Sequence, residues 1–500
     1  MSKTKNAKPI GPFDSLRDYM YALEARGCVR HIDAIDQDAY EATGLMYRFI
    51  DEFGWLGGPA VVFDRVKVDG QWMENPVIAN QFGRWEFDAL AFGIDTEGLD
   101  QRQMYRATLA KLAELMDENG EWATLPPAEV SNAQAPCKEV RVTGDDIDVT
   151  AFPFLQTNPA DGGRYINTGN VVLEDPTHGR NVGTYRCQVK GPKKIAINPE
   201  PNQDGWKFLM GMKERGEPFA KAAVVLGAEP VVYAIGSSKA AGYGQDELAI
   251  AGGLKGKPIN IVKCETNDIM VPADVEMVIE GEIPFDMEPE GPFGEMYGYI
   301  GRYKPENFYM NVTAITYRRN PIFINQFTGV TRHFMTAPLE VTASFKLRKI
   351  FPNFVGLHIA LHIPGFCFVS IDKQGPGEGL AVGREVSKLL KISKITIVVD
   401  KDVDIHDLTE VLHTVGARWQ PSPATHIVDE APGMSGDPST PKRGITSRVV
   451  IDATRQLPEE GGPQEFGKMN RESLVEGQPD IFDRVDKKWS GLLQQWKQDK

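Results

Sequence analysis

The sequence lacks the features that would direct it into or across a membrane. It has no run of 18 or more apolar residues, so no transmembrane helix is expected. Its first eight residues carry charges but no apolar stretch, which does not fit a secretory signal. Its five cysteines never form a C-x-x-C pair, which is typical of reduced thiols and gives no structural zinc signature. We therefore expect a cytoplasmic protein.

Signatures of several common enzyme classes are also missing. The chain has no P-loop, no H-E-x-x-H motif, no G-x-S-x-G elbow and no G-x-G-x-x-G after a strand. Its eight histidines form no close cluster along the sequence, so each is expected to be structural or exposed. The net charge of −14 argues against nucleic acid and anionic membranes as partners. Any chemistry must therefore come from less common motifs.

The length of 500 residues predicts two or three domains, and 41% hydrophobic with 25% charged residues is ordinary globular composition. Helical and strand patterns alternate up to the Pro-rich stretch near 126–136, which predicts an N-terminal α/β domain over 1–145. Short β-rich runs follow, including 222–226 and 231–235, and predict a barrel-like or sandwich-like domain over 146–325.

The remaining residues, 326–500, predict a C-terminal α/β domain. A buried strand over 395–399 precedes a helix over 408–415, and 429–444 has the Gly, Pro, Ser and Asp content of a loop. The last helix places Trp489, Leu492 and other apolar residues largely on one side. That face needs an apolar partner, either this chain or a second subunit.

Two glutamates, Glu290 and Glu295, flank a Gly-Pro-Phe-Gly turn. The Gly-Pro pair argues against a helix, and a turn bracketed by glycines can hold both carboxylates around one small volume. Close carboxylates push their pKa values apart, which suits proton transfer near neutral pH. The alternative is an acidic surface loop.

Three further groups are candidates for binding. On a strand, Asn181 and Arg186 would lie on opposite faces, and an arginine is a natural bidentate partner for a carboxylate. A Gly-Ser-Ser turn after a strand, within 234–238, can hold phosphate. Asp246 and Glu247 precede an apolar helical stretch, where acids are favoured by the helix dipole, although Glu247 can also bind a divalent cation together with Asn181.

Taken together, these motifs resemble the UbiD family of decarboxylases, which use prenylated flavin mononucleotide (prenylated FMN). The likeness extends over about 16–454, and its later motifs are most similar to the ferulic acid decarboxylase branch. The motifs that carry it are Asn181 with Arg186, Gly236-Ser-Ser238, Glu247 before Ala251-Gly-Gly253, 264–272, and Glu290-Gly-Pro-Phe-Gly-Glu295.

The resemblance implies a split β-barrel flavin-binding domain in the centre of the chain and reversible, non-oxidative decarboxylation. The substrate would be an aromatic, heteroaromatic or α,β-unsaturated carboxylic acid that forms a covalent adduct with the cofactor. The implied catalytic residues are Arg186, Glu290 and Glu295, with Glu295 as the proton donor. The implied cofactor-binding residues are Thr168, Thr184, Tyr185, Arg186, Gln203, Ser237, Ser238 and Glu247.

The resemblance also implies a manganese-like divalent ion and a potassium ion beside the flavin phosphate. The implied divalent ligands are Asn181, Glu247 and a histidine, but this sequence has Asp204 in the position of the histidine. Asp204 is a competent oxygen ligand that adds a negative charge near the phosphate. Among the C-terminal lysines, Lys373 is the nearest match to the family's phosphate-binding lysine.

A flavin prenyltransferase is the implied cofactor supplier, and a homodimer or homohexamer is the implied assembly. The run 325–335 is predicted to form a loop on the substrate side, where Arg332 or His333 meets a second polar group. Two alternatives remain open at this point. One is a two-carboxylate hydrolase that needs no flavin, and the other is a non-catalytic subunit of a carboxylase complex.

Overall fold

The computed structural model of the protein describes residues 8–331 and 335–498. Its N-terminal part mixes helices with short strands, and the helix α1 begins where the Ser15 hydroxyl accepts a hydrogen bond from the N–H of Asp18. The buried strand β3 lies inside a sheet of order β1-β3-β6-β18, whose last strand comes from the end of the central part. The elements are α1 (Leu16–Glu24), β1 (Val29–Ile32), β2 (Ile35–Asp36), α2 (Glu41–Phe53), β3 (Ala60–Phe63), β4 (Val66–Val68), β5 (Gln71–Met73), β6 (Val77–Ala79), α3 (Trp85–Ala91), α4 (Gln101–Ala113) and β18 (Phe323–Ile324).

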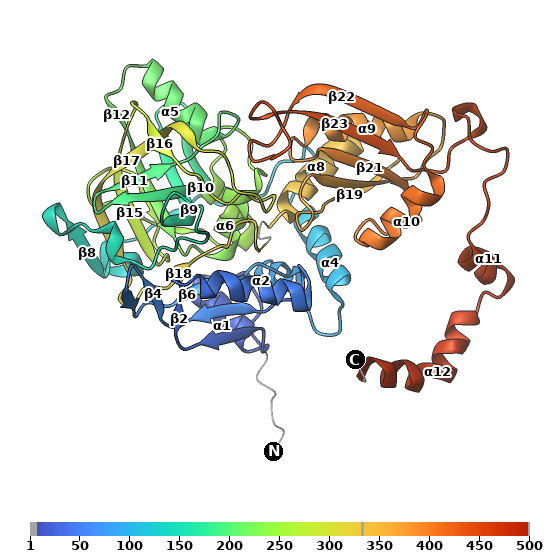
Figure 1. Ribbon diagram of the computed structural model, residues 1–500, viewed down its shortest axis with the longest axis horizontal. Coiled ribbons are helices and arrows are strands. Elements are labelled where there is room, and N and C mark those ends of the chain that lie inside the picture. Colours follow the sequence, from blue (N-terminus) through green and yellow to red (C-terminus); the bar gives the residue numbers. More distant parts are fainter. Residues whose placement is uncertain (1–7, 332–334, 499–500) are drawn as a thin grey trace.

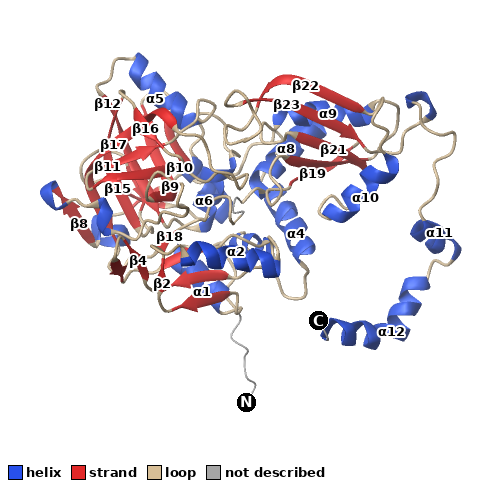
Figure 2. Cartoon of the chain, in the orientation of Figure 1, coloured by secondary structure: helices blue, strands red, loops and turns tan. Residues whose placement is uncertain are grey.

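The central part is a closed barrel of six antiparallel strands in the order β11-β10-β9-β12-β15-β17 (Figure 2). Closure follows because β11 pairs with β17 as well as with β10, which leaves no free edge in the ring. Strands β8 and β16 pair with β17 outside the ring. The strands are β8 (Val140–Thr143), β9 (Tyr165–Asp175), β10 (Gly179–Gly191), β11 (Lys194–Ile197), β12 (Phe219–Leu226), β15 (Met277–Pro284), β16 (Glu288–Glu290) and β17 (Lys304–Tyr317).

Side chains on the two faces of the barrel strands belong to different cores. On β12, Ala222 and Val224 pack in one apolar cluster, whereas Ala223 and Val225 pack in another that contains the helices α6 and α7. This alternation is the period of two expected of a strand that is buried on both faces. The remaining elements of this part are β7 (Ala128–Glu129), α5 (Asp204–Glu214), α6 (Pro230–Ser238), α7 (Glu247–Lys255), β13 (Asn260–Lys263) and β14 (Met270–Pro272).

The stretch 231–235 is helical, so the predicted strand and its Gly-Ser-Ser turn are wrong. Pro230 occupies the first turn of α6, where its missing N–H has no cost. The β-branched Val231 and Val232 favour a strand locally, but both are buried in the cluster that covers the barrel. Burial therefore outweighs the local preference.

The C-terminal part is a five-stranded sheet of order β19-β20-β21-β23-β22. The predicted strand and helix are present as β21 and α10, but the predicted loop over 429–444 is wrong at its start, because β22 continues to Pro432 through an irregular register near Glu430. The elements are α8 (Ala337–Ile350), β19 (Phe354–Ile359), β20 (Phe366–Ile371), α9 (Glu378–Leu389), β21 (Ile395–Asp400), α10 (Leu408–Arg418), β22 (Thr425–Pro432) and β23 (Ile445–Asp452).

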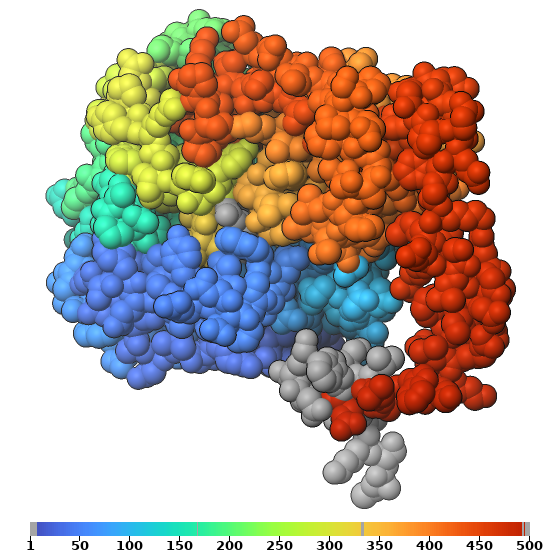
Figure 3. Space-filling view, turned by 45° about the vertical axis from the view of Figure 1, so that its right-hand side comes forward, coloured from blue at the N-terminus to red at the C-terminus, as the bar shows by residue number. Residues whose placement is uncertain are grey.

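Two terminal helices, α11 (Asn470–Gly477) and α12 (Ile481–Gln498), form an arm beside this body (Figures 1 and 3). The arm contacts the body through Glu472 of α11, whose Oε2 lies 3.5 Å from Nη2 of Arg455. Trp489 and Leu492 are 48% and 58% exposed, so these two side chains do not pack back on the chain. The side chains of Leu493 and Trp496 lie outside the described part. No helix within the described residues is long and apolar enough to cross a membrane.

Candidate active site

Arg186 lies at an irregular point of β10, where the pairing with β9 shifts register between Tyr185 and Cys187. A β-bulge of this kind redirects side chains and is frequent beside active sites. The Arg186 side chain is only 8% exposed. A buried guanidinium requires partners, and the two predicted glutamates supply them.

Glu290 forms a bidentate pair with Arg186, with Nε–Oε1 and Nη2–Oε2 distances of 2.9 and 2.8 Å. The Tyr165 hydroxyl donates a third hydrogen bond to Oε1 at 3.0 Å. The Glu290 side chain has no exposed surface. Burial lowers the pKa of Arg186, but the charges of Glu295 and Glu290 outweigh burial and raise that pKa above its usual value. Arg186 and Glu290 are therefore a fixed ion pair.

Glu295 is held more loosely. Its Oε1 lies 2.7 Å from Nη1 of Arg186, and its side chain is 17% exposed. Its backbone closes a turn, because its N–H donates to the carbonyl of Tyr299 at 2.8 Å. The ring of Phe293 lies 5.1 Å from the Arg186 guanidinium carbon. Glu290 is thus fixed by both Arg186 and Tyr165, whereas Glu295 has a single charged contact and is partly exposed to solvent.

A loop of the C-terminal sheet covers Glu295, which the sequence did not predict. A Cβ atom added at Gly436 would lie 2.9 Å from Oε2 of Glu295, and one added at Gly301 would lie 2.6 Å from Oε1. Arg302 fastens the same loop by donating to the carbonyl of Thr440 at 2.7 Å. The Glu295 carboxylate therefore lies between the backbones of Gly301 and Gly436, and a side chain at either glycine would clash with it.

The predicted substrate-side loop also reaches this site. A Cβ atom at Gly329 would lie 2.5 Å from the backbone oxygen of Glu295. The amide of Asn167 anchors the start of the loop by donating to Asn325 Oδ1 at 3.2 Å and to the Gln326 carbonyl at 2.6 Å. Arg332 and His333 lie outside the described residues.

The predicted divalent ligands gather around the Tyr185 hydroxyl. Burial raises the pKa of Tyr185 to about 12; Asn181 hydrogen-bonds to this side chain, and the charges of Glu247 and Asp204 act on it. Burial also raises the pKa of Glu247 to about 8, and one of its oxygens accepts a hydrogen bond from the Val182 N–H at 2.9 Å. Asn181 Nδ2 is buried without a hydrogen-bond partner. The side chains of Asn181 and Glu247 are thus buried beside Tyr185.

Three lysines lie beside this group, and only the structure brings them together. Lys207 pairs with Asp204 at 2.7 Å. Burial lowers the pKa of Lys239, the charge of Asp204 raises it, and the charges of Lys391 and Lys207 lower it, so both of these lysines act on Lys239. Lys373 instead pairs with Glu460 at 2.6 Å. No pattern in the sequence pointed to Lys391, which follows α9.

The other predicted cofactor-binding residues have local partners or none. Thr184 accepts a hydrogen bond from Asn170 at 2.8 Å, and Gln203 accepts one from the Glu200 N–H at 2.7 Å. Ser238 is buried with no partner for its hydroxyl, and Ser237 makes only a long bond of 3.4 Å to the Ala234 carbonyl. The side chain of Thr168 lies outside the described part.

Comparison with known proteins identifies the family. Three family models match in order: the 3-octaprenyl-4-hydroxybenzoate carboxy-lyase (UbiD) N-terminal domain at 20–107, its Rift-related domain at 128–331 and its C-terminal domain at 332–453. A phenolic acid decarboxylase of Sedimentibacter hydroxybenzoicus is 33% identical over 427 residues, which cover 81% of this chain and 85% of that protein.

Solved structures agree with this comparison. Vanillic acid decarboxylase of S. hydroxybenzoicus in its closed form matches with a TM-score of 0.80 and 28% identity, covering 95% of this chain and 99% of that one. The UbiD-class enzyme HmfF of Pelotomaculum thermopropionicum, solved in complex with FMN, matches with a TM-score of 0.74 and 29% identity, covering 91% and 97%. On these matches, together with the Arg186 site, the chain belongs to the UbiD family of carboxy-lyases.

Proposed function

We propose that the protein decarboxylates an aromatic carboxylic acid with prenylated FMN, and that Arg186, Glu290 and Glu295 are its catalytic residues. The observation that carries the proposal is the asymmetric contact of one buried arginine with two glutamates, at 2.7–2.9 Å. Similar proteins are named for phenolic and vanillic acids, and HmfF has been solved with FMN and, in an evolved form, with prenylated FMN. The proposed substrate class also includes heteroaromatic and α,β-unsaturated carboxylic acids.

The residues beside Tyr185 fit the phosphate end of such a cofactor. The ammonium groups of Lys207, Lys239 and Lys391 supply positive charge for a phosphate. A divalent ion such as Mn²⁺ prefers the oxygen ligands that Asn181, Asp204 and Glu247 offer. Such a cation would also hold Glu247 as a carboxylate at neutral pH, which burial alone opposes.

Ser237 and Ser238 fit a different part of the same site. They lie in the last turn of α6, where helix carbonyls rather than N–H groups point outward. The negative end of the helix favours a cation, so we assign these serines to the predicted K⁺ and not to direct phosphate binding.

The chemistry divides between cofactor and protein. Bound prenylated FMN supplies an electron sink for the electron pair that CO₂ loss leaves on the substrate carbon. Arg186 and Tyr165 hold Glu290 in place by hydrogen bonds, and Arg186 positions Glu295. Glu295 then donates a proton from its carboxyl oxygen to the carbon that lost CO₂. The loop that bears Gly436 covers Glu295 and limits the access of water.

The geometry disfavours the hydrolase alternative. Both oxygens of Glu290 already accept hydrogen bonds from Arg186, and one accepts from Tyr165 as well. A carboxylate in this state, with no exposed surface, has no oxygen left to attack a substrate. We further infer that a flavin prenyltransferase supplies the cofactor and that the exposed face of α12 joins chains in a homodimer or homohexamer.

The direct test is CO₂ release from a panel of benzoic, heteroaryl and acrylic acids. Protein co-produced with a flavin prenyltransferase should release CO₂ from at least one aromatic acid, and protein produced without it should release none. Equal release from both preparations would sink the proposal, and so would hydrolysis of a glycoside by the flavin-free protein.

Removing a proposed oxygen ligand should weaken the binding of both the flavin and the divalent ion. In Glu247→Ala and Asn181→Ala, flavin and divalent-metal content should fall together, because each residue would ligate the ion that neutralises the phosphate. Bound flavin is measured by absorbance and metal by mass spectrometry after gel filtration. The exposed Glu214→Ala variant is the matched control and should keep both. Unchanged content in both ligand variants would remove these residues from the site.

A methyl group at Gly436 should disturb Glu295 without disturbing the fold. Its Cβ would meet the Glu295 carboxylate at 2.9 Å, so the carboxylate must move aside. A displacement of about 1 Å can cost roughly 100-fold in rate, and we expect Gly436→Ala to lose up to that much in kcat with its flavin retained. Gly416→Ala is the control, because its Cβ would meet nothing within 4 Å. Wild-type turnover in Gly436→Ala would show that the covering loop does not restrict Glu295.

A further inference from the structure

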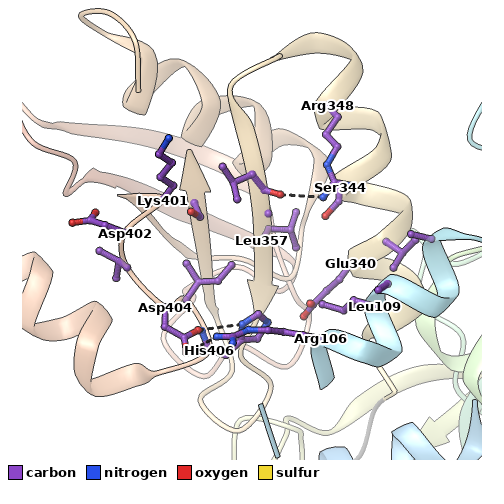
Figure 4. A pocket seen from close by; sticks show the side chains of 18 of the residues that line it. Arg106, Leu109, Glu340, Ser344, Arg348, Leu357, Lys401, Asp402, Asp404 and His406 are labelled. Carbon is purple, nitrogen blue, oxygen red and sulfur yellow. Dashed lines mark hydrogen bonds and ion pairs between the residues drawn. The ribbon is translucent and has the colours of Figure 1, made fainter. Parts of the chain in front are cut away.

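Two histidines and a glutamate meet away from the proposed flavin site, next to a cavity between α4 and the C-terminal sheet (Figure 4). Glu340 comes from α8, His358 from β19 and His406 from the loop between β21 and α10. Each offers one ligand atom, and these atoms all lie within 4.8 Å of one another. The histidines that form no cluster in the sequence therefore form one in space.

Several polar atoms of this cluster have no hydrogen-bond partner among the residues that the structure describes. Glu340 Oε1 accepts a hydrogen bond from the Ile359 N–H at 2.7 Å and lies 3.1 Å from His358 Nδ1. In contrast, Glu340 Oε2, His358 Nε2 and both ring nitrogens of His406 are buried with no hydrogen bond. Buried polar atoms are normally satisfied, so several unsatisfied atoms around one point indicate a missing group.

The surroundings hold the imidazole rings of His358 and His406 in fixed orientations. Glu340 Oε1 lies 3.1 Å from His358 Nδ1, close to the spacing of two ligand atoms on one ion, and thereby orients the ring of His358. Asp404 Oδ1 lies 3.4 Å from His406 Nδ1 and can orient that ring in the same way. The rings of Trp85 and Tyr105 pack edge-on against both imidazoles and close one side of the cluster.

The open side faces a cavity of about 560 Å³. Glu340 and His406 line it together with Arg106, Leu357, Asp404 and other residues of α4, α8 and the sheet. An ion can enter by this route, and a water molecule or a small ligand can occupy a further coordination position. The cavity therefore supplies access that a fully enclosed core cluster would lack.

We propose that Glu340, His358 and His406 bind one divalent transition-metal ion, with Zn²⁺ as the best chemical fit. Two imidazole nitrogens and one carboxylate oxygen suit Zn²⁺ and Co²⁺, whereas Mn²⁺ and Mg²⁺ prefer all-oxygen sites such as the one beside Tyr185. Zinc ligands about 2.0–2.1 Å from the ion lie roughly 3.3 Å apart, so the side chains need to close by at most about 1.5 Å.

The ion would join two parts of the chain. It would fix the loop that carries His406, and Asp404 of that loop pairs with Arg102 at 3.3 Å and with Arg106 at 2.6 Å on α4. The N-terminal helix α4 would thereby be held against the C-terminal sheet. This role is separate from decarboxylation, so its test does not depend on activity.

The experiment uses the full-length protein, freed of metal by chelation and titrated with Co²⁺, whose visible absorbance reports nitrogen and oxygen coordination. One equivalent of Co²⁺ should bind to wild type in the nitrogen- and oxygen-coordinated state that gives this absorbance. His406→Ala and His358→Ala should each weaken binding by more than about 100-fold, because losing a ligand should exceed the 10–100-fold loss typical of an outer partner. His413→Ala, an exposed histidine on α10, should bind as wild type does. Glu247→Ala should do so too, which separates this site from the proposed Mn²⁺ site.

A crystallographic measurement covers the case in which a ligand variant fails to fold. Anomalous scattering at the zinc edge from wild-type crystals soaked in Zn²⁺ should show one peak between Glu340, His358 and His406. The absence of a peak there would overturn the proposal. The proposal would also be overturned if wild type bound no Co²⁺, or if folded His406→Ala bound Co²⁺ as tightly as wild type.

Discussion

Replacing Glu295 by Gln should lower decarboxylation by about 10²–10⁴-fold, the usual contribution of a general acid. Glutamine keeps the shape of the side chain and can still contact the Arg186 region, but it cannot donate and regain a proton. The variant should fold and retain flavin, because Glu295 makes one charged contact and is not part of the apolar core. Exchange of the product C–H with deuterated solvent should fall in parallel with CO₂ release.

The matched control for this variant is Glu288→Gln. Glu288 lies on the same strand as Glu290, but its side chain is 33% exposed and pairs with Lys194 at 2.7 Å rather than with Arg186. Its turnover should stay near that of wild type. If Glu295→Gln turned over at the wild-type rate, Glu295 would not be the proton donor.

Replacing Arg186 by Ala should abolish activity and also destabilise the protein by roughly 3–5 kcal/mol, the usual cost of breaking a buried ion pair. Glu290 would then be buried without its cationic partner, with the Tyr165 hydroxyl still donating to its carboxylate. Arg186→Lys should also lose activity, because one ammonium cannot reproduce the bidentate contact and reach Glu295 as well.

The double variant Arg186→Met with Glu290→Gln separates the two effects. Neutralising both partners should recover much of the lost stability without recovering activity. Denaturant unfolding measures the first quantity and CO₂ release the second. The surface pair of Arg48 and Asp51, whose side chains are 78% and 56% exposed, offers a control, since Arg48→Ala should change neither stability nor CO₂ release. Activity close to wild type in the double variant would mean that the ion pair has only a structural role.

The sequence predicted the α/β parts and the barrel because strand runs and helix caps are local signals. Ser15, a residue type favoured at helix N-caps, caps α1, and the predicted strand over 395–399 is followed by its predicted helix. The helix α6 was misjudged because its valines are β-branched, and only packing on the barrel makes them helical. The end of β22 was missed because its register is irregular.

The site was predicted only in part for the same kind of reason. Arg186, Glu290 and Glu295 could be grouped through the family resemblance, and the structure brings them together. Contacts that depend on domain packing had no local signal. Gly436 over Glu295, Lys391 near Lys239 and the meeting of His358 with His406 each join residues from distant parts of the chain.

The most direct test of the account is the dependence of activity on bound prenylated FMN. Wild-type protein prepared with graded amounts of cofactor is assayed for flavin absorbance and for CO₂ release from one aromatic acid in the same samples. We predict that the rate rises in proportion to bound flavin and is zero without it. A rate that is independent of bound flavin, or no CO₂ release at full flavin occupancy from any acid of the panel, would contradict the account.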